Sequence, residues 1–196
     1  MAKFTKIPAD TFKRLTLNAG VILSDFKPAT GAFERDKQLG ATSGGITFSA
    51  TPTFTDNGDD VDNCPKDTKE LKSLESIEVK CSGTFVTVTT ASAKSLMAAA
   101  DISVDDTTKV TPRYNLEDAD FTDIWIVADY SDKNGATNGG FVAIHLINAL
   151  STGGFQLKTA DKNKGQMAFE YKAHASLADQ DTVPYELFIK AGTDEA

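Results

Sequence analysis

The sequence predicts a mainly β protein: a β-sandwich or barrel with one flanking α-helix and long loops. Several short segments alternate between apolar and polar residues with the period of two that is typical of strands, and turn residues separate them. One segment has the composition of a regular helix. Because 196 residues suit a single β domain and no period repeats, we expect one domain over residues 1–196.

The N-terminal third is expected to contain an arm, a strand and a loop. Residues 9–17 are mildly amphipathic, which suits a short helix or an extended arm. Within residues 1–14, four basic residues stand against one acidic residue, so this arm is locally basic. A strand is expected at residues 21–26, and residues 27–45 then form a long loop with few apolar residues.

Residues 46–55 carry the clearest strand pattern. Their apolar side chains share one face, and hydroxyl side chains fill the other, among them Thr47, Ser49, Thr51 and Thr53. Pro52 cannot donate a backbone hydrogen bond, so the strand is expected at a sheet edge or with a bulge. A second alternation begins at Ile77 and changes phase after Phe85, which predicts a bulge or bend at residues 83–86.

One helix and further strands are expected in the remaining chain. Residues 92–100 are rich in good helix formers, with Thr90 or Ser92 available as the N-cap. Apolar residues fall on both faces of the strands expected at residues 124–130 and 141–150, so each strand should be covered on both sides by the core or by a neighbouring subunit. An Asn-Gly step at Asn134 favours an antiparallel hairpin between them. The later strands are expected at residues 104–112, 124–130, 141–150, 155–158, 167–175 and 184–190.

Composition argues against several classes of function. The formal net charge of −8 disfavours direct binding of phosphate, yet an acidic surface suits DNA as a neighbour that must not adhere. Cys64 and Cys81 form no paired motif and are expected as reduced thiols, with Cys81 buried. No targeting segment or membrane span is expected, so we predict a protein made in the cytoplasm without contact with a membrane.

The sequence contains no recognisable catalytic motif, and we expect neither enzymatic activity nor a cofactor. His145 lies in an apolar strand, where a core or interface histidine is the favoured interpretation, and His174 should be exposed. No serine lies in a nucleophile elbow, and the glycine-rich residues 40–45 precede a strand rather than the helix that a phosphate-binding loop opens.

Two acidic stretches are candidate sites. The loop that contains Asp56, Asp59, Asp60 and Asp62 does not follow the EF-hand pattern, so a solvated turn is favoured over a weak calcium site. Residues 101–132 hold nine acids and two bases. This tract is interpreted as a solvated face or as a negative surface that repels a polyanion.

Taken in order, several segments resemble the major tail tube proteins of long-tailed bacteriophages that infect Gram-positive bacteria. No one motif is diagnostic, and the order and spacing carry the resemblance over most of the chain. The segments are LNAGVILSDF (17–26), LGATSGG (39–45), DNGDDVDN (56–63), TKELKSLESIEVKCSGTF (68–85), AADI (99–102), DIWIVADYSD (123–132), ALSTGGFQL (149–157), KGQMAFEYKAH (164–174) and VPYELFI (183–189).

The resemblance implies a structural protein of the virion tail. Subunits of that family form hexameric rings that stack into a tube, enclose the tape measure protein and conduct DNA into the host without binding it specifically. Partners are then other copies of the chain, the tape measure protein, and the tail terminator and distal tail proteins at the tube ends. No cofactor is implied.

We therefore expect the arm (residues 1–20) and the loop (residues 27–45) to contact other subunits, because a lone domain would leave such segments unordered. Deleting residues 31–40 is expected to leave the monomer folded and to block polymerisation. Candidate lumen or interface residues are Thr47, Ser49, Thr51, Thr53, Asp101, Asp105, Asp106, Phe33 and Leu39.

Two alternatives stay open. A carbohydrate- or cell-surface-binding β-sandwich would need an aromatic-lined groove on one sheet. A tube protein of a contractile tail or tailocin would share the fold, and the sequence does not separate it from the tube of a flexible tail.

Overall fold

The computed structural model describes residues 7–32, 34–131 and 139–193. As expected, it is mainly β, with one α-helix. The helix is α1 (Thr90–Leu96). The strands are β1 (Thr16–Leu23), β2 (Thr42–Asp56), β3 (Lys72–Phe85), β4 (Ala100–Ile102), β5 (Val110–Pro112), β6 (Thr122–Tyr130), β7 (Gly140–Ser151), β8 (Met167–Lys172) and β9 (Tyr185–Lys190).

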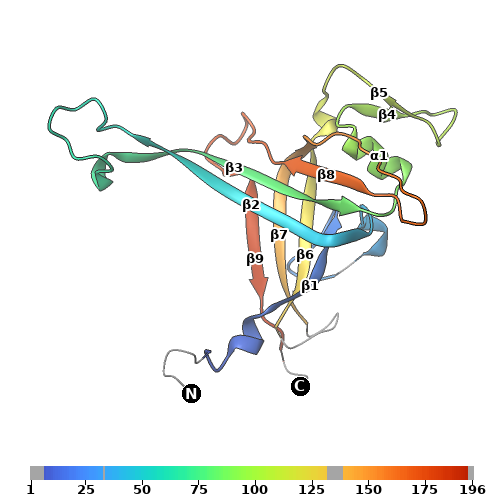
Figure 1. Ribbon diagram of the computed structural model, residues 1–196, viewed down its shortest axis with the longest axis horizontal. Coiled ribbons are helices and arrows are strands. Elements are labelled where there is room, and N and C mark those ends of the chain that lie inside the picture. The colour runs from blue at the N-terminus through green and yellow to red at the C-terminus, as the bar shows by residue number, and fades with distance from the viewer. Residues whose placement is uncertain (1–6, 33, 132–138, 194–196) are drawn as a thin grey trace.

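The main sheet is antiparallel and curls into two layers. Its strand order is β1-β6-β7-β8-β3-β2, and β9 also pairs with β7. The change of layer occurs on β7, because its residues 141–146 pair with β9 whereas Leu150 and Ser151 pair with β8. Figure 1 shows β1, β6, β7 and β9 running vertically, with β2, β3 and β8 crossing in front. The two layers therefore pack as an orthogonal sandwich.

The core fills the space between these layers. Phe85 and Tyr171, 0% and 1% exposed, are its largest side chains, and the ring of Phe85 stacks on Phe169 with centroids 4.3 Å apart. Helix α1 closes one end of the core through Leu96, which is fully buried. The hydroxyl of Tyr171 lies 2.9 Å from that of Ser95, so it finds a partner on the helix.

Strands β6 and β7 are buried on both faces, as the sequence predicts, and the chain itself provides both covers. Ile124 and Ile126 face the main core, whereas Trp125 faces a second cluster on the outer side of the sheet. Phe26, which follows β1, packs against the rings of Trp125 and Phe141 in that cluster. The two strands are antiparallel as expected, and the Asn134 step between them lies outside the described residues.

The helix begins earlier and ends earlier than expected. Its N-cap is Thr89 rather than Thr90 or Ser92: the Thr89 hydroxyl accepts a hydrogen bond from the Ser92 N–H, and the Ser92 hydroxyl accepts one from the Thr89 N–H. This reciprocal arrangement is a capping box. After Leu96 the chain turns at Ala98, where φ is +63°, and enters β4.

Most expected strands are present with different bounds. The structure begins β1 five residues early, at Thr16, and the preceding arm contains a short 3₁₀ turn, Thr11–Arg14. The strand expected at residues 104–112 is reduced to β5, and β8 ends at Lys172. The strand expected at residues 155–158 is absent, and only an isolated bridge joins Lys158 to Gln166.

The irregularity expected on β3 at residues 83–86 lies on its neighbour instead. Thr42 pairs with Phe85 and Ile46 with Gly83, so β2 carries two extra residues there. Gly44 and Gly45 accommodate them with φ of +82° and +84°, in the left-handed region that glycine adopts without strain. Strand β3 itself pairs regularly with β8 up to Phe85, and the apparent phase change marks its end.

Candidate assembly surfaces

The hairpin of β2 and β3 projects beyond the body of the protein. Its strands pair from Ile46 opposite Gly83 to Asp56 opposite Lys72. Figure 1 shows its far end extending to the left, away from the other strands. Strand β2 lies at the edge of the sheet, which confirms the edge position predicted from Pro52. The register shifts next to Thr53, but the extra residue there is Glu75 of β3, opposite the step from Thr53 to Phe54.

The apolar face of this hairpin is buried only in its near half. There Phe48 packs against Tyr185, with ring centroids 5.7 Å apart, and Ala50 packs against the core. Farther out, Phe54 is the cross-strand partner of Leu74, and each is 52% exposed. Exposed apolar surface that continues a buried face is typical of a contact with another chain.

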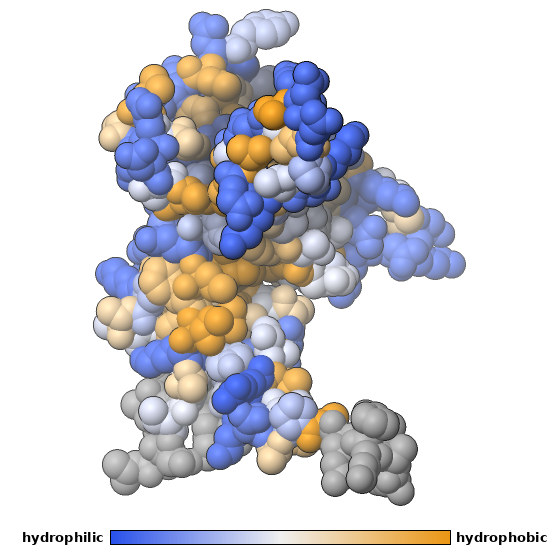
Figure 2. Space-filling model, turned by 90° about the vertical axis from the view of Figure 1, so that its left-hand side faces the viewer, coloured by the Kyte–Doolittle hydropathy of each residue, from blue (hydrophilic) through white to orange (hydrophobic). Residues whose placement is uncertain are grey.

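A second uncovered apolar stretch lies on β9. Leu187 and Ile189 are 54% and 60% exposed, and they pair across the sheet with Ile144 and Val142. The same face buries Tyr185 against the core, so this stretch also continues a buried surface. Figure 2, which views the molecule from the side of the hairpin, shows apolar side chains gathered below the hairpin.

The opposite face of β2 is polar and wetted. Thr47, Ser49, Thr51 and Thr53 are all exposed. Thr51 pairs with Glu78 on β3, whose carboxylate accepts a hydrogen bond from Lys172 and lies 3.1 Å from Lys80. The hydrogen bond from Lys172 contributes most to lowering the pKa of Glu78 below its ordinary value. The hydroxyl face therefore continues into a row of paired charges.

The acidic loop at the hairpin tip is organised by its own backbone. The two carboxylate oxygens of Asp56 accept hydrogen bonds from the N–H groups of Gly58 and Asp67, each 2.9 Å long, and these bonds lower its pKa. Asp59, Asp60 and Asp62 are exposed. No group of three metal-ligating side chains occurs within the described part of the chain, so the calcium alternative gains no support.

The acids of residues 101–132 do not form one face. Arg113 gathers several of them: its Nε lies 2.7 Å from Asp101 Oδ2, and its Nη2 donates to Asp120 Oδ1 at 2.7 Å. The Asp120 side chain is fully buried. Burial raises its pKa, but hydrogen bonds from the Glu117 N–H and from Arg113 outweigh burial and hold the pKa below its ordinary value.

The three acids of this tract that were named as lumen candidates therefore differ. Asp101 is bound by Arg113, whereas Asp106 accepts hydrogen bonds from the N–H and hydroxyl of Thr108 within its own turn. Asp105 is exposed. Only Asp105 remains a simple solvated carboxylate of the kind that the tract predicts.

The loop after β1 folds back on its own domain. Leu39 packs against the main core, and its N–H donates to the Ile22 carbonyl at 3.1 Å. Gly40 lies so close to the Phe85 ring that a Cβ there would be 2.8 Å from it. Deleting residues 31–40 would remove these contacts with the core, so we now expect the deletion to destabilise the monomer as well. Phe33, the other candidate in this loop, lies outside the described residues.

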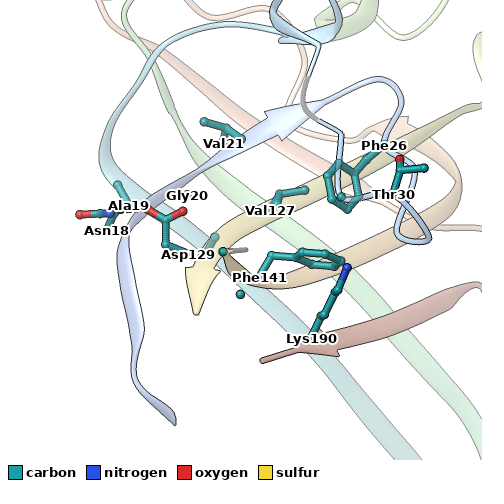
Figure 3. Close-up of a pocket in the computed structure, with 14 residues that line it drawn as sticks. Asn18, Ala19, Gly20, Val21, Phe26, Thr30, Val127, Asp129, Phe141 and Lys190 are labelled. Atoms are coloured by element: carbon teal, nitrogen blue, oxygen red, sulfur yellow. Dashed lines mark hydrogen bonds between the residues drawn. The ribbon is translucent and has the colours of Figure 1, made fainter. Parts of the chain in front are cut away.

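A cavity of about 480 Å³ lies on the outer side of the sheet, between β1, β6 and the segment after β1 (Figure 3). Val127, Phe26 and Phe141 contribute apolar surface, and the Lys190 ammonium lies 5.9 Å from the centre of the Phe141 ring. The Phe26 and Phe141 side chains are only 5% and 8% exposed. Rings this buried give no open platform for a sugar.

The two histidines each pack against an aromatic ring. His145 stacks on Trp125 with ring centroids 4.0 Å apart, and its two nitrogens lie 3.1 Å from Asp123 and 3.2 Å from Glu186. This agrees with the expected packed histidine. His174, which was expected to be exposed, is half-buried and lies against the ring of Phe121.

The two cysteines are free thiols, as expected. Burial raises the pKa of Cys81 to about 12, so its thiol stays protonated and unreactive. Cys64 is half-buried in the hairpin tip, next to Gly58.

Comparison with known protein families gives no match, and no curated protein matches the chain. Within the described residues, no helix is long and apolar enough to cross a membrane. Sequence reasoning missed the cluster around Arg113 and the exposure of the far half of the hairpin. Only the exposure of the hairpin could have been inferred from the sequence. The alternating pattern continues to Phe54, and no further apolar segment was predicted to cover it.

Proposed function

We propose that the protein is a structural subunit that assembles with copies of itself into stacked hexameric rings, forming the tail tube of a long-tailed bacteriophage. The tube would enclose the tape measure protein and conduct DNA, with tail terminator and distal tail proteins at its ends. The observation that carries the proposal is the projecting hairpin, whose buried face continues outward through Phe54 and Leu74, each 52% exposed.

Three further features support assembly over a solitary role. The edge strand β2 has 15 residues, and an edge of this length is a ready template for pairing with another chain. Leu187 and Ile189 give a second uncovered apolar stretch. The net charge of −8 and the hydroxyl face of β2 suit a channel wall along which DNA passes without adhesion.

The sugar-binding alternative is less well supported, because the aromatic rings that line the described cavity are buried. The proposal assigns no catalytic step to the protein. A tube of a contractile tail or tailocin remains the alternative, and the shape of the assembled particle distinguishes it from the tube of a flexible tail.

Negative-stain electron microscopy of the concentrated protein tests the proposal. The wild-type protein is expected to form hollow filaments or rings. The double variant Phe54→Ser/Leu74→Ser should remain dispersed while keeping its fold, because both side chains lie outside the core. As a matched control, Val104→Ser/Leu177→Ser removes apolar side chains that are 95% and 89% exposed on other loops and should assemble normally. Monomers of wild-type protein at every concentration would refute the proposal.

A further inference from the structure

The β2–β3 ribbon carries opposite charges at its two ends. At one end is the hairpin tip (residues 57–71), which holds five acids and two bases. At the other end, Ser43 of β2 and Val86, directly after β3, line a cavity of about 500 Å³ with three lysines: Lys158, Lys162 and Lys164. At about 3.3 Å per residue, the 15 residues of β2 separate these ends by roughly 50 Å. Figure 1 shows the hairpin tip at the left and the loop before β8 at the right of the longest axis.

The charged groups at the tip are available for another partner. Asp59, Asp60 and Asp62 are exposed, and within the described part of the chain their carboxylates have neither a hydrogen bond nor an ion pair. The turn that presents them is fixed, because Asp56 binds the backbone at Gly58 and Asp67. The tip is therefore a shaped surface with three unpaired negative charges.

The lysine loop (residues 158–166) is its counterpart. Its ends are joined by two backbone hydrogen bonds, from Lys158 N–H to the Gln166 carbonyl at 2.8 Å and from Gln166 N–H to the Lys158 carbonyl at 2.9 Å. The three ammonium groups are exposed and have no ion-pair partner among the described residues. Asp161 is the one acid of this loop, which leaves it with a net positive charge of two in a protein of net charge −8.

We propose that the lysine-lined cavity of one copy receives the acidic hairpin tip of the next copy. The inference rests on the proposed self-assembly and specifies one of its contacts. Since the two surfaces differ and lie at opposite ends of one ribbon, the contact is head-to-tail. A head-to-tail contact gives closed rings or open filaments rather than a symmetric dimer.

This contact also gives the tip acids a role. The sequence favoured a solvated turn over a weak calcium site for this loop, and in the proposed arrangement its acids pair with lysines across the interface. Such exposed pairs are screened by salt, with a Debye length of about 10 Å at 0.1 M and about 3 Å at 1 M. Association is therefore expected to weaken as the ionic strength rises.

A charge-exchange experiment tests the contact. The tip variant carries Asp59→Lys/Asp60→Lys, and the cavity variant carries Lys162→Glu/Lys164→Glu. Each variant alone presents like charges at both ends and should associate at least about 10-fold more weakly than wild type by sedimentation velocity. An equimolar mixture should recover association, because each reversed tip then meets an oppositely charged cavity. Circular dichroism and thermal unfolding check that both variants fold, as expected for exposed side chains.

The controls separate this contact from general charge effects. Asp25→Lys/Asp181→Lys makes the same change in net charge as the tip variant, at two exposed acids elsewhere, and should associate like wild type. Variants that associate normally while wild type assembles would overturn the contact but leave the proposed function standing. The contact would also be overturned if each variant alone fails to associate and their mixture does not recover association. Binding of inorganic phosphate to the cavity without any effect on association would overturn it too. A wild-type protein that stays monomeric would overturn both proposals.

Discussion

The two halves of the β2–β3 hairpin follow one sequence pattern and have different surroundings. In the near half, Phe48 and Ala50 lie on the core, whereas in the far half Phe54 and Leu74 are half exposed. Alternation of apolar and polar residues therefore reports that a strand has two unlike faces, not that one of them is buried within the same chain. Where the pattern outruns the domain, a second chain is the natural cover.

The largest effect on stability is expected from a cavity in the core on which the near half packs. Phe85 is fully buried and stacks on Phe169. Phe85→Ala should lower the free energy of unfolding by about 3–5 kcal/mol, since it removes a large ring and leaves a cavity. Urea denaturation measures this change, and a loss below about 1 kcal/mol would show that the layers are not packed as described.

The cluster around Arg113 should make a smaller, pH-dependent contribution in the body. Because the folded pKa of Asp120 lies below its ordinary value, its stabilising contribution is present above the ordinary pKa of about 3.9 and is lost as the pH falls through the folded pKa. Asp120→Asn should therefore be less stable than wild type at pH 7, and the two should converge in acid. Denaturant midpoints across this pH range would show it, and a constant difference would contradict the assignment.

At the helix, Thr89→Ala should cost about 1 kcal/mol through loss of the capping box. Thermal unfolding followed by circular dichroism measures this loss. Thr87→Ala is not a suitable control, because the Thr87 hydroxyl accepts a hydrogen bond from the Ala41 N–H. Thr107→Ala, at an exposed loop position, is a suitable control. Equal stability of Thr89→Ala and wild type would mean that the cap does not hold the helix.

The far half should show the smallest effect on stability. Phe54→Ser/Leu74→Ser is expected to change the free energy of unfolding of the monomer by less than about 1 kcal/mol, because surface substitutions are usually nearly neutral. Urea denaturation at a concentration where the protein is monomeric checks it. A loss as large as that of Phe85→Ala would show that these side chains are covered within the monomer.

The sequence predicted the fold class well because periodicity and turn residues reflect local geometry. Pro52 alone pointed to the edge position of β2. Long-range contacts could not be predicted in this way. The bulge of β2 lies opposite Thr84 because Gly44 and Gly45 can adopt positive φ. Leu39 reaches the core only because its loop folds back over β1.

The sequence predicted which residue types form the candidate surfaces, but not which groups surround each of them in the fold. The hydroxyl face from Thr47 to Thr53 is exposed as expected. Acids that look alike in the sequence separate in the structure, where Asp120 is buried beside Arg113 and Asp105 is solvated. That difference depends on which bases the fold brings near, and spacing along the chain does not contain it.

Hydrogen–deuterium exchange at low and high protein concentration tests the central claim most directly. Assembly is expected to slow amide exchange in the far half of the hairpin, residues 51–56 and 72–76. Residues 77–82 of the near half, on the inner strand β3, should keep the exchange rates of the monomer. Equal exchange of the far half at both concentrations, in a sample that has assembled, would contradict the claim that this face is covered by another copy.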